Sequence, residues 1–284
     1  MAANDSNLSI AVFSIASLVA IAAGCVAMAK SGIAPSAWLR SVAAWIVGAG
    51  VAWLLARYGK PRSASIGAIV LTTVALIATL YAPAVDGVHR WLDVGPLHIN
   101  AAALFLPAVI VGLATVRIAK PMGIAITLVA TTILLAQPDA SQLTAFAIAV
   151  FILVARSAMA PRWKVFAFLI ATVFTICGWM RPDTLQPVAE VEQIFGMCVA
   201  ASPILAFIAG LALAAAALAP LARSAPTAHP ARDAAVALSA YFVTVSIAPF
   251  FGWFPVPLVG LGMGFPVGWW LGMGLLLVIG RRPQ

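Results

Sequence analysis

Apolar residues fall into ten long runs separated by short polar segments, and this alternation is the dominant pattern in the chain. The runs span approximately 8–29, 37–56, 65–85, 99–116, 121–136, 142–158, 164–180, 193–222, 234–251 and 256–280. Most of them approach the ~20 residues that a helix needs to cross a hydrocarbon core of ~30 Å. The pattern predicts an all-α polytopic membrane protein with about ten transmembrane helices, organised as a single domain over residues 1–284.

Two of these runs are expected to depart from a simple span. The eighth is unusually long and contains Pro203, which predicts a kink or a break, because proline removes a helix hydrogen bond and clashes with the preceding turn. The first run follows seven residues without the basic segment of a cleaved signal peptide, so we expect it to remain as a span.

Composition supports lipid as the solvent of this protein. Hydrophobic residues make up 64% of the chain and charged residues only 8%, whereas soluble domains carry about a quarter charged residues. The net charge of +8 does not indicate nucleic-acid binding, since there is no basic run interleaved with aromatic residues. The three cysteines, Cys25, Cys177 and Cys198, lie inside apolar runs and form no disulfide or metal-binding pattern.

Basic residues between the runs predict the orientation through the positive-inside rule. With the amino terminus in the cytoplasm, twelve of the sixteen lysines and arginines fall in cytoplasmic segments. These twelve are Arg57, Lys60, Arg62, Arg117, Lys120, Arg156, Arg162, Lys164, Arg223, Arg232, Arg281 and Arg282. The remaining four, Lys30, Arg40, Arg90 and Arg181, fall outside. Both termini are therefore predicted to be cytoplasmic.

Carboxylates have the opposite distribution. Six of the eight lie on the predicted extracytoplasmic side, namely Asp86, Asp93, Asp139, Asp183, Glu190 and Glu192. Ionisable residues at a bilayer surface are candidates for acid–base work or cation binding. This face of the protein is therefore where we expect its chemistry.

The segment from Asp86 to His98 contains the pair Arg90-Trp91. An indole at the membrane interface can hold a neighbouring guanidinium at headgroup level, where it suits bidentate binding of a phosphate or diphosphate. The alternative is an interfacial anchor without a ligand. His89 and His98 lack the spacing of metal ligands, so no metal site is predicted there.

Two further stretches carry carboxylates at predicted helix starts. Asp139, in Gln137-Pro138-Asp139, is placed to cap the sixth span. Glu190 and Glu192 precede the eighth span, where a partly desolvated carboxylate would have a raised pKa and could act as a general base. The alternative is a solvated pair favoured by the helix dipole.

Glycines recur every four residues at Gly260, Gly264, Gly268 and Gly272, a spacing that favours close helix packing. No nucleotide-binding, Ser-His-Asp or zinc-protease motif is present in the sequence.

Taken in order, these stretches resemble the shape, elongation, division and sporulation (SEDS) family, which includes FtsW, RodA and SpoVE. That family has an Arg-Trp followed by Gly-Pro, then a Gln-Pro-Asp turn, then a closing Pro-x-Pro with glycines and a terminal Arg-Arg. The matching residues are Arg90, Trp91, Gly95, Pro96, Gln137, Pro138, Asp139, Pro255, Pro257, Gly262, Arg281 and Arg282. The resemblance runs over nearly the whole chain and implies a multi-pass protein of the bacterial cytoplasmic (inner) membrane.

The family also has a Pro-Glu-x-x-x-Asp-Phe-Ile-Phe stretch, which residues 187–195 resemble. This resemblance places Glu192 at the position of the family's proposed catalytic Asp, as the candidate base. Glutamate keeps the carboxylate but moves it by one methylene, and a base must approach its proton to ~3 Å. The resemblance implies a supporting role for Asp139. It also implies that substrate is bound by Arg90, Trp91, Gly95, Pro96 and Gln137.

The implied activity is that of a peptidoglycan glycosyltransferase, which polymerises glycan strands from lipid II at the extracytoplasmic face. Its substrate would be linked to undecaprenyl diphosphate, and its expected partners are the lipid bilayer and a class B penicillin-binding protein, with no nucleic acid. The one candidate cofactor is a divalent cation near Asp139.

Some family features are missing from this sequence. The family has a glutamate and a lysine in the segment corresponding to Asn100–Leu106, and Gly260 stands where it has a serine. The loop between spans seven and eight is also short. Two alternatives therefore stay open. One is a non-catalytic structural subunit of a larger membrane complex. The other is a lipid or solute transporter, which the scarcity of charge within the spans disfavours.

Overall fold

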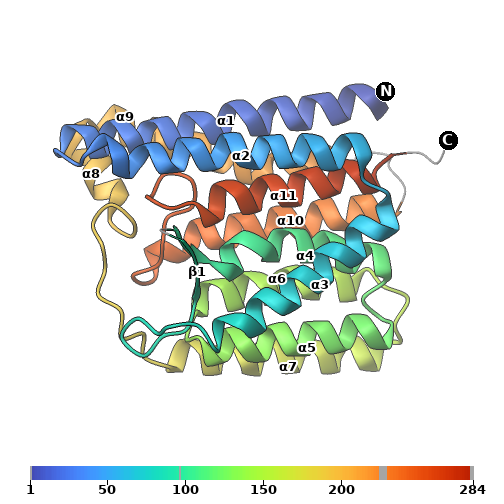
Figure 1. Ribbon diagram of the computed structural model, residues 1–284. Coiled ribbons are helices and arrows are strands. Elements are labelled where there is room, and N and C mark those ends of the chain that lie inside the picture. The colour runs from blue at the N-terminus through green and yellow to red at the C-terminus, as the bar shows by residue number, and fades with distance from the viewer. Residues whose placement is uncertain (1, 96, 224–228, 282–284) are drawn as a thin grey trace.

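The computed structural model describes residues 2–95, 97–223 and 229–281, and within these residues it is a bundle of apolar helices (Figure 1). Among the described residues, six helices are long and apolar enough to cross a membrane, and four further apolar helices are shorter. The helices are α1 (Ala2–Lys30), α2 (Pro35–Tyr58), α3 (Pro61–Thr79), α4 (Ala101–Val116), α5 (Pro121–Ala136), α6 (Ala140–Ala155), α7 (Pro161–Met180), α8 (Ile194–Ala201), α9 (Pro203–Leu218), α10 (His229–Ile247) and α11 (Gly264–Ile279). The polytopic all-α fold is confirmed.

Proline sets the beginning of several helices. It is the first residue of α2, α3, α5, α7 and α9, where its fixed φ suits the first turn and its missing N–H costs nothing. The predicted interruption of the eighth run is confirmed, because Ser202 is extended (φ −175°) and separates α8 from α9.

Two predicted spans are too long, and a hairpin was missed. The third ends at Thr79 rather than at residue 85. The following segment contains an antiparallel hairpin of β1 (Trp91–Val94) and β2 (Leu97–Asn100). The last span begins at Gly264 rather than at residue 256.

The apolar segment before α11 is a loop because its backbone pairs with another loop. Val256 N–H donates to Val191 O over 3.1 Å, and Leu261 N–H donates to Glu190 O over 2.7 Å. Two prolines in this segment also remove donors that a helix would need. Backbone N–H and C=O groups inside a membrane protein must be paired. Here they pair between two loops about 65 residues apart in sequence rather than within a helix.

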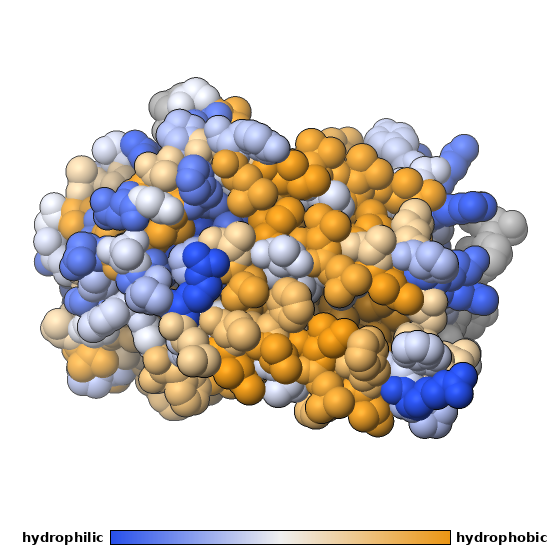
Figure 2. Space-filling model, turned by 90° about the horizontal axis from the view of Figure 1, so that it is seen from below, coloured by the Kyte–Doolittle hydropathy of each residue, from blue (hydrophilic) through white to orange (hydrophobic). Residues whose placement is uncertain are grey.

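The helices lie roughly parallel, with α1 and α2 on one side, α5 and α7 on the other, and α4, α10 and α11 in the middle (Figure 1). The beginning of α1 and the end of α11 lie at the same end of the bundle, as an even number of crossings requires. The segments 80–100, 181–193 and 251–263 lie at the opposite end, called here the loop end. Figure 2 shows an apolar middle band flanked by polar residues at both ends. The cytoplasmic location of the termini stays a prediction.

Small residues bring α11 against its neighbours, as the glycine spacing predicted. A Cβ on Gly268 would stand 2.1 Å from Ala103 O of α4, and one on Gly272 would stand 2.8 Å from Pro107 Cβ. Gly260 lies outside the helix, in the loop that precedes it. The closely packed α4–α11 pair fixes where both helices begin at the loop end.

The loop 251–263 rests on α1 through a glycine. A Cβ on Gly24 would stand 1.9 Å from Val259 O, so only hydrogen fits there. We predict that Gly24→Ala displaces this loop and destabilises the protein by about 1–3 kcal/mol, as overpacking commonly does. The check is thermal unfolding of the purified protein in detergent.

Gly50→Ala is the matched control, since no atom outside its own helix lies within 4 Å of a Cβ at this exposed position of α2. Alanine favours helix over glycine, so this variant should unfold at or slightly above the wild-type temperature. Equal unfolding temperatures for Gly24→Ala and wild type would contradict the packing argument.

Candidate functional site

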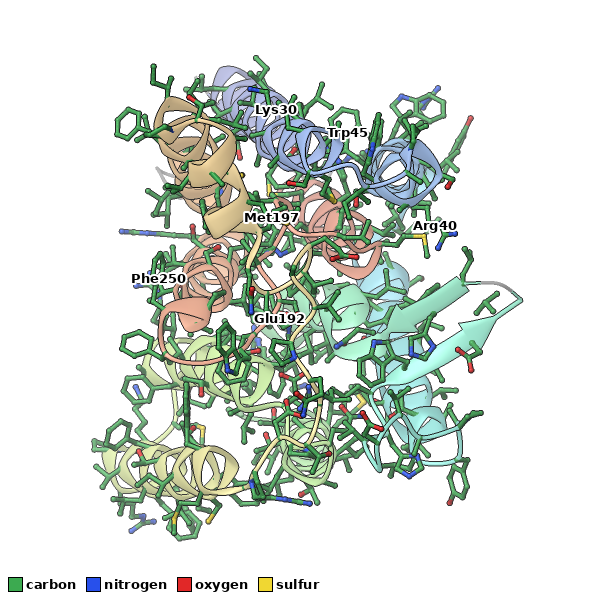
Figure 3. The ribbon with its side chains drawn as sticks, turned by 90° about the vertical axis from the view of Figure 1, so that its left-hand side faces the viewer. Lys30, Arg40, Trp45, Glu192, Met197 and Phe250 are labelled. Atoms are coloured by element: carbon green, nitrogen blue, oxygen red, sulfur yellow. The ribbon has the colours of Figure 1, made fainter. Side chains whose placement is uncertain are left out.

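A cavity of about 370 Å³ lies at the loop end, where the three loop segments meet. Six ionisable residues from segments distant in sequence line it: Asp86, Arg90, His98, Asp139, Asp183 and Glu192. Figure 3 looks onto this end and shows Glu192 near its middle, with Lys30 and Arg40 toward the periphery. The sequence-predicted Arg90, Asp139 and Glu192 are therefore brought together around one cavity.

Arg90 is a buried cation that ties three segments together. Only 5% of it is exposed. Its Nε donates to Gln137 O over 2.9 Å, and its Nη2 donates to Pro138 O and, over 2.7 Å, to Asp183. The guanidinium thus fastens the α5–α6 turn to the segment 181–193, while Nη1 makes no hydrogen bond within the described residues. Most of its donors are committed internally, which limits what Arg90 can offer a ligand.

Asp139 has the capping role that the sequence predicted. Its Oδ1 accepts hydrogen bonds from the Gln142 N–H at 3.2 Å and the Ser141 hydroxyl at 3.0 Å, which satisfies the beginning of α6. Its Oδ2 lies 3.9 Å from Arg90 Nε. With 3% exposure, this carboxylate is a neutralising partner of Arg90 as well as a cap.

Glu192 is a half-buried carboxylate in the loop before α8, outside the membrane-spanning segments. Its Oε2 accepts the Val188 N–H at 2.7 Å. Burial raises the pKa of the Glu192 carboxyl, backbone N–H groups lower it, the nearby Asp183 charge raises it, and Arg90 lowers it; the net pKa lies above the ordinary value. A carboxylate with a raised pKa in a cavity has the properties of a general base.

Two amide side chains also line the cavity, and sequence reasoning missed both as site residues. Gln142 Oε1 accepts the Tyr241 hydroxyl of α10, and Asn100 Oδ1 accepts the Ala103 N–H at 2.9 Å as the cap of α4. Asp183 was recognised only as one of six outer carboxylates. No sequence signal marks Gln142, because its position depends on a helix about 100 residues away.

The other residues predicted to bind substrate differ in whether they line the cavity. Trp91 lines the cavity and stacks on His98 with ring centroids 5.0 Å apart. Gly95 occupies the hairpin turn with φ +59° and does not line the cavity, and Pro96 lies outside the described residues. Gln137 is 1% exposed and bonds to Thr79, so its side chain faces α3 rather than a ligand. Neither Gln137 nor Gly95 is among the residues that line the cavity in this structure.

Metal-binding geometry is lacking at this site. Within the described ranges, no three His, Cys, Asp or Glu side chains cluster as metal ligands. Asp139 and Asp183 both pair with Arg90, whose single positive charge compensates for one of the two negative charges. The residues do not fit the candidate divalent cation.

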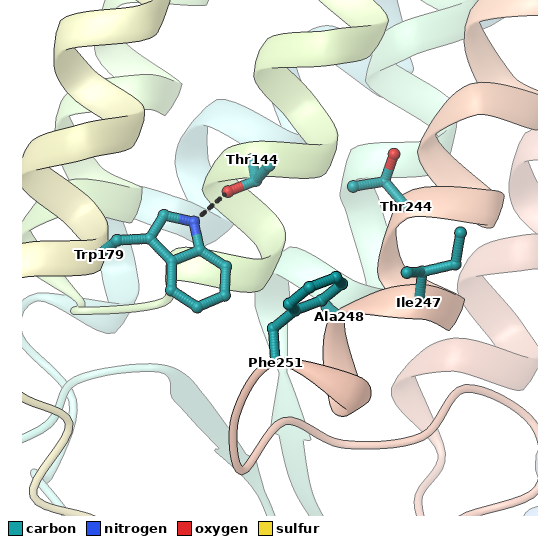
Figure 4. A pocket seen from close by; sticks show the side chains of 6 residues that line it. All are labelled: Thr144, Trp179, Thr244, Ile247, Ala248 and Phe251. Carbon is teal, nitrogen blue, oxygen red and sulfur yellow. Dashed lines mark hydrogen bonds between the residues drawn. The ribbon is translucent and has the colours of Figure 1, made fainter.

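A second, larger hollow of about 480 Å³ lies between α6, α7 and α10 (Figure 4). Its wall is mostly apolar, and the Trp179 indole donates to Thr144 over 2.9 Å within it. None of its lining residues is ionisable, so it offers no group for acid–base chemistry. The loop-end cavity is therefore the candidate site.

The role of Arg90 can be tested by removing its charge. We predict that Arg90→Met destabilises the protein by about 3–5 kcal/mol, because two carbonyls and two carboxylates lose a buried partner. Arg181→Met is the control, since exposed Arg181 has Leu135 O as its one acceptor among the described residues, and its loss should cost less than about 1 kcal/mol. Thermal unfolding of both variants measures the difference, and equal losses would refute the assignment.

Comparisons with known proteins give the same fold. No protein-family profile and no curated protein matches the sequence. Among solved structures, RodA of Thermus thermophilus, a rod shape determining protein, matches with 18% identity and a TM-score of 0.58, covering 95% of both chains. An aspartate-to-alanine variant of the same RodA matches with 17% identity and a TM-score of 0.64, covering 95% of this chain and 96% of that one.

A chain of a peptidoglycan synthase complex that coordinates polymerisation and crosslinking matches with 17% identity and a TM-score of 0.65, over 95% of this chain and 96% of its own. The resemblance inferred from the ordered motifs is thus confirmed at the level of architecture. The chain has the polytopic helical fold of RodA.

Proposed function

We propose that this protein is a peptidoglycan glycosyltransferase of the SEDS type, which extends glycan strands from lipid II at the outer surface of the bacterial cytoplasmic membrane. The observation that carries the proposal is the loop-end cavity, which combines a half-buried carboxylate of raised pKa with a buried guanidinium. Its position at the end of an apolar bundle suits a substrate whose tail stays in lipid and whose headgroup lies at the surface.

The proposed reaction is a displacement at the anomeric carbon of the donor sugar. An acceptor hydroxyl attacks this carbon, Glu192 takes the hydroxyl proton, and the bond between the anomeric carbon and the diphosphate oxygen breaks. The bonding electrons leave with the diphosphate. The Val188 N–H holds Glu192, and Arg90 with Asp183 holds the loop in which Glu192 lies. Arg90 and Asp139 therefore act by positioning, with Nη1 left for a ligand oxygen.

The partner we propose is a class B penicillin-binding protein, which would crosslink the strands that this protein makes. The match to a chain of a peptidoglycan synthase complex supports an assembly of this kind. The exposed apolar surface of the helices would in that case be shared between lipid and the partner's membrane anchor.

A second candidate is a non-catalytic subunit of such an assembly. The observation that favours it is the uncharged beginning of α4, where Asn100 and Ala103 line the cavity without the glutamate and lysine of the family pattern. Polymerisation by the purified protein separates the two candidates, because a structural subunit has no turnover.

The base assignment predicts the effect of removing one carboxylate. Glu192→Gln should reduce glycan polymerisation from lipid II by at least about 100-fold, the usual contribution of a general base. The measurement is glycan strand formation by the purified protein in liposomes. Glu190→Gln is the control, since that side chain does not line the cavity, and it should retain activity. Wild-type rates in Glu192→Gln would eliminate Glu192 as the base.

The neighbouring charges predict the pH dependence. Glu192 acts as the carboxylate, so the rate falls as pH decreases through its raised pKa. Asp183→Asn removes a charge that raises this pKa and leaves Arg90 less neutralised, so the acid limb of the rate profile should move to lower pH. Asp93→Asn, on the exposed hairpin, should leave the limb unchanged. A shift to higher pH would contradict the assignment.

A further inference from the structure

We propose that a cavity between α5, α6 and α7 binds an anionic phospholipid, with one acyl chain inside the cavity and the phosphate against Lys120 and Arg162. The cavity lies at the end of the bundle opposite the loop end, called here the termini end (Figure 1). It is separate from the loop-end cavity, and its occupation by lipid does not depend on any catalytic activity there.

The interior of this cavity suits hydrocarbon. Its volume is about 240 Å³, and its lining on α7 runs from Trp163 to Ala171, which is about 12 Å along the helix. Apart from the Trp163 indole at its outer end, its polar side chains are Thr127 and Thr131. Their hydroxyls donate to Gly123 O over 2.8 Å and to Thr127 O over 2.7 Å, within their own helix. These side chains therefore leave no polar group for a ligand inside the cavity, and an apolar chain is the occupant that fits.

The cavity forms where α7 stands away from its neighbours. Near the loop end α7 packs tightly, because a Cβ on Gly178 would stand 2.5 Å from Leu143 Cδ2 of α6. Gly178 is the one buried residue among those of α7. Toward the termini end, Leu128 of α5 and Phe166 of α7 line the cavity and are still 44% and 53% exposed. The cavity is thus open on the lipid-facing side of the bundle, where an acyl chain can enter.

Cations border the cavity at the termini end. The lining residues Ile118 and Trp163 directly follow Arg117 and Arg162 in the chain. The Arg162 guanidinium lies over the Trp163 ring, 6.0 Å from its centroid, which places a positive charge at the mouth of the cavity. Lys120 is the N-cap residue of α5 at the same mouth. Neither the Lys120 nor the Arg162 side chain has a hydrogen bond or ion pair within the described residues.

The charge around this mouth is positive overall. The bordering segments 117–121 and 156–164 contain five lysines and arginines and no carboxylate. Among the described residues, the one carboxylate paired with them is Asp233, which binds Arg156, so four of the five cations have no carboxylate partner. The helices α5 and α7 also begin here without a side-chain cap, and helix beginnings favour anions. Figure 2 shows the face formed by α5 and α7 as apolar, bordered at the termini end by hydrophilic residues. An apolar cavity with a cationic mouth matches a phospholipid whose headgroup is anionic.

The test is native mass spectrometry of the full chain in detergent, titrated with phosphatidylglycerol and, separately, with phosphatidylcholine of the same acyl chains. Wild type should bind one phosphatidylglycerol about tenfold more tightly than phosphatidylcholine, because cations at a membrane surface favour anionic lipid. The double variant Lys120→Gln with Arg162→Gln should lose about tenfold in affinity for phosphatidylglycerol and keep its affinity for phosphatidylcholine.

The matched control is Arg57→Gln with Lys60→Gln, at the α2–α3 turn of the same end. Arg57 also lies over an aromatic ring, 5.5 Å from the Tyr58 centroid, and Lys60 is also the N-cap residue of a helix that begins with proline. Neither lines the cavity, so this variant should bind both lipids as wild type does. Ala167→Leu fills the cavity and should weaken both lipids at least about fivefold, whereas Ala125→Leu, exposed outside it, should not.

Equal affinity of wild type for the two lipids would overturn the proposal. Equal losses in the two charge-pair variants would also overturn it, since they would indicate diffuse attraction to the whole basic end. Unaltered binding in Ala167→Leu, with folding verified by thermal unfolding, would place the acyl chain elsewhere. If Ala167→Leu does not fold, the comparison of the two charge-pair variants decides. A wild-type protein that binds neither lipid would refute the lipid site and leave the cavity to the helix of a partner protein.

Discussion

The candidate site depends on one buried cation. A guanidinium withdrawn from water must find partners, and Arg90 finds them in two carbonyls of the α5–α6 turn and in the carboxylates of Asp139 and Asp183. This requirement fixes segments that are 47 and 93 residues away in sequence. Because Asp183 belongs to the loop that carries Glu192, the position of the proposed base follows from the partners of Arg90. In the sequence, Arg90 resembled a ligand-binding residue. In the structure, its hydrogen bonds mainly hold together the segments that form the site.

The same rule of paired polar groups shapes the other walls of the cavity. The loop 251–263 is apolar yet not helical, since its N–H groups donate to the carbonyls of Glu190 and Val191. Gly24 lets this loop rest on α1, and Gly268 lets α11 approach α4. The beginnings of three helices consequently converge where the loops meet, and donors that cannot be used within those helices face the cavity.

Sequence patterns predicted the features that depend on local order. Hydrophobic run length predicted the helices, Pro203 predicted the break between α8 and α9, and Asp139 predicted a helix cap. The ordered motifs singled out Arg90, Asp139 and Glu192, and all three line the loop-end cavity. The hairpin at 91–100, the loop before α11 and the orientation of Gln142 by Tyr241 were not predictable, because each is decided by partners that are distant in sequence.

The central claim is that the loop-end cavity receives a diphosphate-linked lipid headgroup beside Glu192. An experimental structure of the protein bound to undecaprenyl diphosphate tests it most directly. We expect the diphosphate to lie inside the loop-end cavity, with Glu192 facing the space left for the sugars. A headgroup lying elsewhere on the protein, with the loop-end cavity empty, would contradict it.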